Sequence, residues 1–457
     1  CISSVPSHED TTSSPSLVNI INLSMPKVIV REARISCLLN KLKTSSASDH
    51  NGINNKMLKC LSPSLSPILC ALFSQFLSTN TIPSDWKVAK VVRIFKSGDR
   101  THPLNYHPIS TTSTICKLLE HVLYTEIINC LEDHNIIFGY QHGFRWGYSC
   151  ETQLAGFLHH IHSYLDLGFQ VDAIFLDFSK AFDRVPHHRQ IVKLMNLNIH
   201  PTVIGRIKNS LSSRSQYTSV SNSTSSSTNA TSGVPQGSVL GPLFFLIYVN
   251  DLPNCVSFIR LFAGGCVIYQ MISCDNDKDI LLADLNANNT WCSTWLMTPN
   301  TAKTQLLSFT RCMHRSPTSY VINNNIIQLT TSYKYLGVHL QSDLTCHHHI
   351  RLTLASANRS LGLLKRNIKH APGNLRRLAY ITLKRLEIEY ASAIWDTSQI
   401  YITQEIESLQ NRAAHFIFFD YLPYTSISAL KTCAQLDDLF HRRRTARLSL
   451  LHNLYHH

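Results

Sequence analysis

Charged side chains are scarce in this chain: Asp, Glu, Lys and Arg make up 16% of its 457 residues, while hydrophobic residues make up a normal 44%. That balance excludes wholesale disorder, which requires few apolar residues and many charges. Long apolar runs are also missing, since the densest, 243–249, is far shorter than the ~20 residues of a membrane-spanning helix. No basic segment followed by an apolar one opens the sequence, so no secretory signal is expected. No Met begins it, which is compatible with a fragment or a processed product.

Paired cysteines with metal-site spacing are missing as well. None of the 14 Cys belongs to a C-x-x-C pair, and without a secretory signal a disulfide framework is not expected. We therefore expect reduced, mostly buried thiols in an intracellular protein, in the nucleus or the cytoplasm. The run Cys346-His347-His348-His349 is not expected to bind zinc, because adjacent ligands rarely converge on one tetrahedral ion and no second Cys/His pair lies at a usable spacing.

A basic excess is what the composition does contain. Lys plus Arg (42) minus Asp plus Glu (29) gives a net charge of +13, and 24 His add to it at lower pH. This charge favours a polyanionic partner, nucleic acid before membrane, although a basic protein without such a partner fits it about equally well. At roughly 100–200 residues per domain, the length allows two to four domains.

Apolar spacing and turn residues predict a mixed chain of helices and strands. Residues 1–28 are rich in Ser and Thr and predict a poorly ordered leader. The Ser/Thr tract 210–232 predicts a flexible loop, although the alternation at 217–220 would permit a hairpin. The other expected elements are helices within 30–76, 115–131 and around 191–195, strands at 88–95 and 171–178, a strand-turn-strand at 261–269, and mainly helices beyond residue 335.

An Asp lies near the end of the expected strand 171–178. A helical stretch follows, so Asp177 would lie at the carboxyl end of an apolar strand and point into a cleft, where a carboxylate can hold a divalent ion. Capping of the following helix is the competing role. This segment alone fits both roles equally well.

A second unusual segment is 232–242, which has three Gly and two Pro in eleven residues. Glycine permits close approach of a ligand to the backbone, and the amide of Gln236 offers both a donor and an acceptor. A plain structural turn is the alternative, but turns rarely open directly into an apolar run such as 243–248.

Together and in their order, these motifs resemble the reverse transcriptases of non-LTR retrotransposons of the jockey-like kind. The resemblance runs from about residue 82 to residue 390 and on towards the C-terminus. The segments that carry it are 95–99 (FKSGD), 105–110 (NYHPIS), 141–145 (QHGFR), 176–183 (LDFSKAFD), 232–241 (SGVPQGSVLG), 261–263 (LFA), Asn300 with Lys303, and 333–338 (YKYLGV).

The resemblance implies an α+β right-hand polymerase with fingers, a palm of antiparallel sheet and helices, and a mainly helical thumb. It implies RNA-directed DNA synthesis, a nucleotidyltransferase reaction whose partners are a template–primer and dNTPs, with no membrane. The expected divisions are a leader at 1–28, N-terminal helices and fingers with the start of the palm at 29–170, the palm at 171–340, and the thumb and C-terminal helical region at 341–457.

In this family two Mg²⁺ ions activate the primer 3′-hydroxyl and stabilise the leaving pyrophosphate. One Asp at a strand end and two adjacent Asp in a hairpin turn hold them, and Asp177 matches the first. Lys303 matches the lysine proposed to protonate pyrophosphate. The family's Phe-Ala-Asp-Asp is Phe-Ala-Gly-Gly here, so Gly264 and Gly265 occupy the two remaining metal positions. Glycine offers no side-chain oxygen to a hard cation, so we expect this copy to be inactive. The Gly-Gly pair is expected to supply the turn's positive φ, so folding should survive.

Five residues match nucleotide-contacting positions of the family. Phe182 matches the aromatic ring that crowds the sugar 2′-position, and Gln236 and Gly237 match the strip that positions the incoming nucleotide. Lys96 lies in the matching fingers motif. His107 stands where the fingers usually carry an Arg that grips the triphosphate, and a largely neutral imidazole lacks that charge and its bidentate fork.

Two further family positions and one basic stripe complete the prediction. Asp183 is a family carboxylate that we expect to be structural, and Arg93 replaces a usual Pro. A stripe in the expected thumb would contact the template–primer phosphate backbone, although each member taken alone is better explained as a solvated charge. Its members are Lys365, Arg366, Lys369, Arg376 and Arg377.

The sequence therefore predicts the reverse transcriptase domain of a non-LTR retrotransposon in a catalytically inactive copy. The alternative is a non-enzymatic nucleic-acid-binding protein derived from the same fold. Both hypotheses rest on the same residues.

Overall fold

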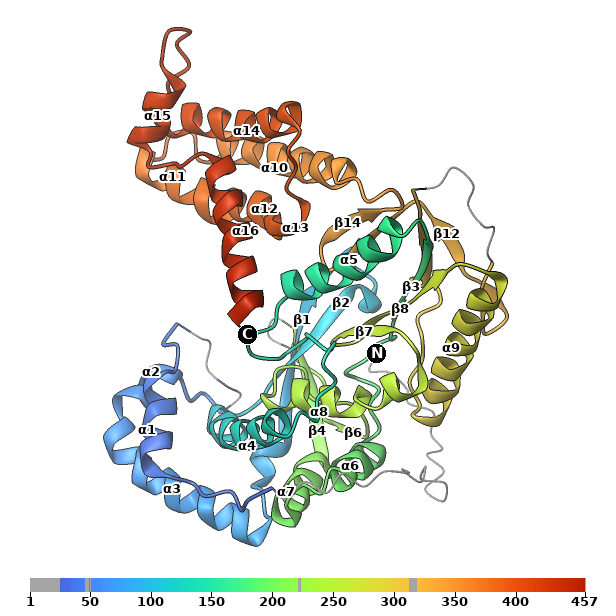
Figure 1. Cartoon of the computed structure of the whole chain (residues 1–457). Helices are drawn as coiled ribbons and strands as arrows, with labels where there is room; N and C mark the ends of the chain where they lie inside the picture. Colours follow the sequence, from blue (N-terminus) through green and yellow to red (C-terminus); the bar gives the residue numbers. More distant parts are fainter. Residues whose placement is uncertain (1–24, 46–48, 50, 221–222, 312–318, 457) are drawn as a thin grey trace. The chain divides into compact units, whose positions relative to one another are not determined.

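A computed structural model describes residues 25–45, 49, 51–220, 223–311 and 319–456. It shows a mixed α+β chain, as predicted (Figure 1). None of the helices in these ranges is both long and apolar enough to cross a membrane. The chain divides into two compact units, and the division falls within β3 (Gln170–Asp177), β8 (Gly265–Ile272) and α9 (Asp275–Thr294).

The first unit comprises Cys1–Phe144, Leu176–Cys266 and Asp284–Ala302. Its helices share one apolar core, in which Phe73, Leu118 and Leu243 are buried. Met25 and Val28 are also buried there, so the end of the expected leader packs into the core, while residues 1–24 lie outside the described ranges. Its complete elements are α1 (Glu32–Asn40), α2 (Asn55–Cys60), α3 (Ser62–Thr79), η1 (Ser84–Lys87), β1 (Val88–Phe95), η2 (Pro103–Asn105), β2 (Tyr106–Thr111), α4 (Thr114–Asp133), α6 (His187–Asn196), α7 (Pro201–Leu211), β4 (Arg214–Val220), β5 (Ser223–Thr224), β6 (Thr228–Ala230), α8 (Leu240–Val249), η3 (Leu252–Cys255) and β7 (Ile259–Phe262).

The sheet of this unit has the order β2-β1-β4-β5, with β6 also paired to β4. Strand β1 runs antiparallel to β2 and parallel to β4. The expectation of a flexible loop over 210–232 is therefore wrong for β4, β5 and β6, and the permitted hairpin is present, with Ser219 opposite Thr224. Sheet pairing outweighs the low strand propensity of Ser because β4 is sandwiched between β1 and β6.

The second unit comprises Arg145–Phe175, Val267–Ala283 and Lys303–His457. Strands β3 and β9 pair antiparallel within it, with Val171 opposite Phe309, in a sheet of order β12-β9-β3-β8-β7. The run 171–175 is buried throughout, as a strand covered on both faces requires. Its other elements are α5 (Cys150–Asp166), β9 (Gln305–Phe309), β10 (Val321–Ile322), β11 (Asn325–Ile326), β12 (Gln328–Thr330), β13 (Ser332–Tyr335), β14 (Val338–Gln341), α10 (His347–Asn367), α11 (Gly373–Tyr380), the π-helical turn η4 (Ile381–Arg385), α12 (Leu386–Glu389), α13 (Ser392–Trp395), α14 (Ile400–Phe418), α15 (Ile427–Cys433) and α16 (Leu439–His456).

The C-terminal helices of the second unit have an apolar core of their own, in which Leu361, Tyr380 and Phe416 are buried. The expectation of mainly helical structure beyond residue 335 is confirmed, apart from the short strand β14. The run 346–349 begins α10, and burial lowers the pKa of His349 to about 4.

Candidate active site

Strand β3 delivers Asp177 to the turn between β7 and β8. The amide of Phe178 donates to the Gly264 carbonyl at 3.3 Å, and the Asn300 amide donates to the Asp177 carbonyl at 2.7 Å. Burial raises the pKa of the Cys266 thiol in β8, and the neighbouring Cys292 and Asp177 raise it further. The structure therefore places the end of β3 beside the β7–β8 turn, the two segments that the resemblance assigned to one site.

The positive φ of this turn lies at Ala263, with a φ of 52°, and not at either glycine. The expectation that Gly-Gly supplies it is wrong. A Cβ built on Gly264 would lie 3.0 Å from the Ala181 Cβ, and one on Gly265 would find its nearest neighbour, the Phe262 carbonyl oxygen, at 3.7 Å. Both glycines have backbone angles open to L-residues, so position 265 has room for a side chain, whereas a side chain at 264 would require Ala181 to shift slightly.

The motif at 141–145 contacts this turn through hydrogen bonds to β7 and to Ala263. The Gln141 Oε1 accepts from the amides of Gly143 and Ala263, at 2.9 and 3.0 Å. The His142 amide donates to Leu261 in β7, and a Cβ on Gly143 would collide with the Ala263 amide. Sequence reasoning quoted this motif but assigned it no role, and the structure shows that it fixes the turn.

The donors at this turn do not fit a pair of Mg²⁺ ions. Asp177 offers one carboxylate, and Gly264 and Gly265 offer no side-chain oxygen. No group of three or more His, Cys, Asp or Glu within the described ranges could hold a metal ion. The next acidic residues along the chain lie in the first turn of α9 and have partners there. The Asp277 carboxylate accepts from the Ser273 hydroxyl, and Asp275 pairs with Lys278.

Phe182 lies between two other aromatic rings of the first unit. It stacks on Phe245 in α8, with ring centroids 4.7 Å apart, and meets Phe144 edge-on at 5.9 Å. Its carbonyl accepts from the Val234 amide at 2.9 Å. The ring is therefore fixed beside the glycine-rich segment 232–241.

That segment, here called the strip, is tied to its neighbours through its backbone. The Gly233 amide donates to Val185, and the Ser110 amide of β2 donates to the Gln236 carbonyl at 2.7 Å. Gly237 has a φ of 113°, and a Cβ there would collide with the Ser110 carbonyl. Glycine is therefore required at 237, because β2 approaches the strip too closely for any side chain.

Asp183 anchors the side chain of Gln236. The Gln236 Nε2 donates to the Asp183 Oδ1 at 3.0 Å. Burial raises the pKa of Asp183, while the positive charge of Lys180, the Gln236 hydrogen bond and His107 oppose the rise. The expectation of a structural role for Asp183 becomes specific: its carboxylate orients Gln236 and lies within electrostatic reach of His107.

The β1–β2 hairpin carries Lys96 and His107 on one face. His107 is opposite Ile94, and the Lys96 amide donates to Asn105, so alternation puts both side chains on the same side. Both residues are exposed. Arg93 belongs to the opposite face, where its guanidinium lies 5.1 Å from the centre of the Tyr106 ring.

Glu120 is a residue that sequence reasoning missed. It is buried in α4, and its Oε2 accepts from the Val239 amide at 2.7 Å, just before α8 begins. Burial raises its pKa, against the amides of α8 and the charge of Arg214. A Glu between the apolar residues Leu119 and Val122 was the available signal, because a buried carboxylate requires donors.

The remaining predicted residues lie in the second unit. Lys303 is exposed in the turn before β9, and Lys365 and Arg366 lie in the last turn of α10. Arg376 is buried against Phe416, so its assignment to a phosphate-contacting surface is wrong. Arg377 donates to the Ala434 carbonyl and to Gln435.

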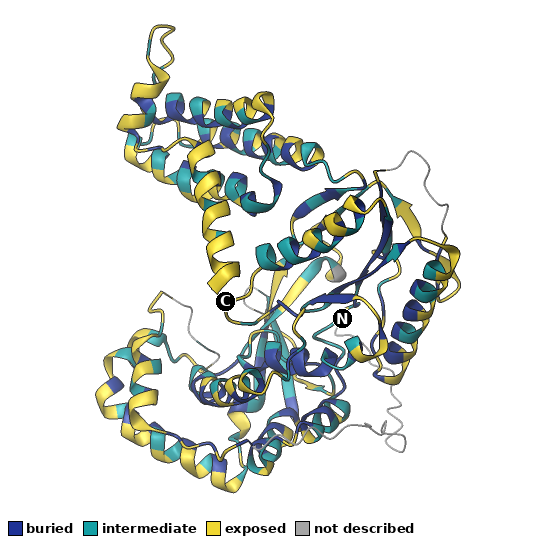
Figure 2. Ribbon diagram, viewed as in Figure 1, coloured by how far each residue is buried: buried dark blue, intermediate teal, exposed yellow. Residues whose placement is uncertain are grey.

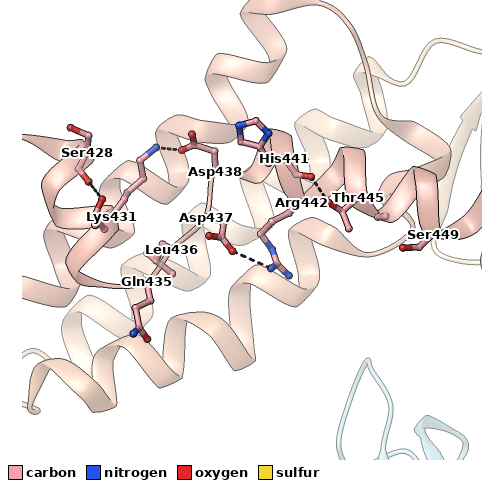
Figure 3. A pocket seen from close by; sticks show the side chains of 12 residues that line it. Ser428, Lys431, Gln435, Leu436, Asp437, Asp438, His441, Arg442, Thr445 and Ser449 are labelled. Carbon is pink, nitrogen blue, oxygen red and sulfur yellow. Dashed lines mark hydrogen bonds and ion pairs between the residues drawn. The ribbon is translucent and has the colours of Figure 1, made fainter.

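A groove of about 1070 Å³ lies between α15 and α16 (Figure 3). Its charged side chains pair with one another: Lys431 with Asp438, and Arg442 with Asp437. It contains none of the residues that the sequence assigned to chemistry.

A family model described as reverse transcriptase (RNA-dependent DNA polymerase) matches residues 94–340, more than half of the chain. The chain belongs to this family. Within it, the chain is similar to a probable RNA-directed DNA polymerase from transposon BS of Drosophila melanogaster, 27% identical across 88% of this chain and 46% of that protein. It is also similar to the RNA-directed DNA polymerase from mobile element jockey of Drosophila funebris, 27% identical across 73% of this chain and 38% of that protein.

The chain spans about half the length of the curated relatives it matches. The predicted resemblance to reverse transcriptases of non-LTR retrotransposons is confirmed. The matched range includes the 262–265 turn, which carries glycine at both 264 and 265.

Proposed function

We propose that this reverse transcriptase domain keeps the framework for binding a template–primer and a dNTP but does not catalyse DNA synthesis. The observation that carries the proposal is the 262–265 turn, which leaves Asp177 as the carboxylate beside two glycines. One carboxylate cannot clamp two Mg²⁺ ions, and clamping and charge stabilisation provide most of the catalysis of phosphoryl transfer.

The residues that match nucleotide-contacting positions support the binding part of the proposal. Phe182 would crowd the sugar 2′-position, and Gln236 and Gly237 would position the incoming nucleotide. Lys96 and His107 share the hairpin face that would meet its triphosphate. In the second unit, Lys303 would serve the pyrophosphate, and Lys365, Arg366 and Lys369 the template–primer backbone.

The proposal also keeps the divisions expected from the sequence, with fingers and the start of the palm in 29–170, palm in 171–340 and thumb in 341–457. Because templates and dNTPs occur inside cells, we place the chain in the nucleus or the cytoplasm.

The second candidate is a nucleic-acid-binding protein that uses the fold without catalysis. The net charge of +13 favours it, as do the exposed Arg366 and Lys369 and the half-buried Lys365, none of which needs a metal site. Binding of a primed template that weakens steeply with salt, with no extension by any variant, would support this candidate over a decayed polymerase.

The test is primer extension with Mg²⁺ and dNTPs by the natural chain, Gly264→Asp, the double variant Gly264→Asp/Gly265→Asp, and that double variant with His107→Arg. We expect no extension by the first two and measurable extension by the double variant. The His107→Arg change should then act mainly on the nucleotide KM, because an arginine grips the triphosphate in the ground state and the transition state alike.

Extension by the natural chain that Asp177→Ala abolishes would contradict the proposal, since another carboxylate would then complete the site. Extension that Asp177→Ala leaves intact would point to a contaminating polymerase, which a mock preparation checks.

A further inference from the structure

Helix α14 ends in aromatic rings that remain exposed. Phe419 is 48% exposed and Tyr421 is 53% exposed. Tyr421 lies nearly parallel to the ring of His415, with centroids 5.9 Å apart, and meets Phe419 edge-on at 5.8 Å. The segment that follows α14 is exposed along much of its length (Figure 2). Exposed rings that touch one another offer flat faces on which another ring can stack.

Two lysines from the end of α10 lie against these rings. The Lys365 Nζ is 5.5 Å from the centre of the Tyr421 ring, and the Lys369 Nζ is 5.5 Å from the centre of the Phe419 ring. We call His415, Phe419, Tyr421, Lys365 and Lys369 the cap patch. Within the described part of the chain, neither lysine forms an ion pair, so the patch has uncompensated positive charge.

The nearest acid in sequence does not offset that charge. The carboxylate of Asp420 accepts from the Leu422 amide at 3.0 Å and from the Thr425 hydroxyl at 2.9 and 3.0 Å. It is therefore engaged in its own loop. The patch as a whole presents flat rings and cations, which fits an anion that carries aromatic rings.

The backbone holds one of the rings in an unfavourable conformation. Phe419 caps α14 with a φ of 57°, in the left-handed region that a residue with a Cβ rarely adopts and that Gly or Asn adopts most easily. Arg376 fixes the ring from the buried side, with its guanidinium 5.6 Å from the ring centre. An exposed Phe in this position contributes little to the core, and its ring is held in place at the surface.

We propose that the cap patch binds an unpaired stretch of nucleic acid, with bases stacked on Tyr421 and Phe419 and phosphates beside Lys365 and Lys369. Bases within a duplex have both faces covered by their neighbours, so the patch selects unpaired strands. This inference rests on the proposed nucleic-acid binding and adds the form of the strand and the site that holds it. An acidic protein surface would need the cations but not the rings.

The test measures binding of the full chain by fluorescence anisotropy to three labelled probes: an unstructured oligothymidylate, a strand of equal length made of abasic sites, and a duplex of equal length. The variants are Phe419→Asn and Tyr421→Ala. Asn accepts the left-handed conformation, so Phe419→Asn removes the ring without straining the helix end. Tyr421→Trp restores a stacking face, and Tyr455→Ala removes an 83% exposed ring of α16 as the matched control.

We expect the natural chain to bind oligothymidylate at least tenfold more tightly than the abasic strand, since one stacked base contributes about a factor of ten. Phe419→Asn and Tyr421→Ala should each lose about fivefold or more for oligothymidylate only, Tyr421→Trp should keep it, and Tyr455→Ala should change nothing. Losses that are equal for all three probes, or no loss, would overturn the inference. Failure of the natural chain to bind any probe would overturn the proposed function as well.

Discussion

The 262–265 turn and the 232–241 strip both belong to the first unit, but they differ in how much of the fold depends on them. The strip is bonded to β2 and to the segment after Phe182, and Gly237 and Gln236 are fixed by backbone and side-chain contacts. At the turn, the backbone is held by Gln141, while positions 264 and 265 have backbone angles open to any residue. The residues at 264 and 265 can therefore change while the fold remains, whereas changes in the strip affect the fold as well as the site.

The largest expected effect is the loss of Glu120, which ties α4 to the strip just before α8 begins. Glu120→Ala should lower the free energy of unfolding by about 3–5 kcal/mol, because it orphans the Val239 amide and leaves the buried Arg214 without a counter-charge. Urea denaturation followed by circular dichroism measures this. Glu126→Ala, an exposed position in α4, is the matched control and should change stability by less than about 0.5 kcal/mol. Equal effects of the two variants would contradict the buried role.

The next effect compares the two regions directly. Gly237→Ala should destabilise the chain by about 2–4 kcal/mol, because its Cβ meets the Ser110 carbonyl at a positive φ. Gly265→Ala should instead stabilise it by about 0.4–1 kcal/mol, because the nearest atom lies 3.7 Å away and the backbone is unstrained. The same denaturation assay checks both. If the two variants behave alike, the turn and the strip do not differ in the way described.

Features that depend on local sequence were predictable in these regions, and features that depend on distant partners were not. Strand β3, strand β1 and the β7–β8 hairpin were predictable because a buried strand requires a run or an alternation of apolar residues. The absence of metal ligands at the turn was also visible, because identity alone decides whether a residue offers oxygen. The positive φ at Ala263 was not predictable, because Gln141, whose side chain accepts from the Ala263 amide, lies more than a hundred residues away in the sequence.

Tertiary pairing explains the other errors. The Ser/Thr tract forms β4, β5 and β6 because β1 pairs with β4, and composition does not encode that pairing. Arg376 has the charge of a phosphate contact, but the aromatic residues at the end of α14 bury it. Glu120 was missed for the same reason, since its donor comes from the distant strip.

Restoring the carboxylates should make the turn depend on metal. In EDTA, the double variant Gly264→Asp/Gly265→Asp should be less stable than the natural chain by about 1 kcal/mol, because two carboxylates are added beside Asp177. Mg²⁺ at about ten times its Kd should then stabilise the variant by about 1.4 kcal/mol. Thermal unfolding with and without Mg²⁺ measures the shift. Asp177→Ala in the double variant is the control and should remove it, while a shift of the same size in the natural chain would mean that the glycine turn does bind the ion.

The smallest effect concerns Asp183 and pH. Burial raises the pKa of Asp183 above its ordinary value. In the pH window between the pKa of the unfolded state and that of the folded state, the folded chain therefore binds a proton that the unfolded chain does not. The contribution of this carboxyl to stability therefore falls as pH rises through the window and is constant above it. Asp183→Asn cannot ionise, yet it keeps an oxygen that accepts from Gln236. It should be more stable than the natural chain by about 0.5–1 kcal/mol at pH 7, and the difference should vanish below pH ~3, where the carboxyl is protonated in both states. Asp279→Asn, which changes an exposed carboxylate, is the matched control. Urea denaturation at the two pH values decides the matter, and a loss of stability by Asp183→Asn at pH 7 would mean that the ionised carboxylate, through Lys180 and His107, stabilises the strip more than burial opposes it.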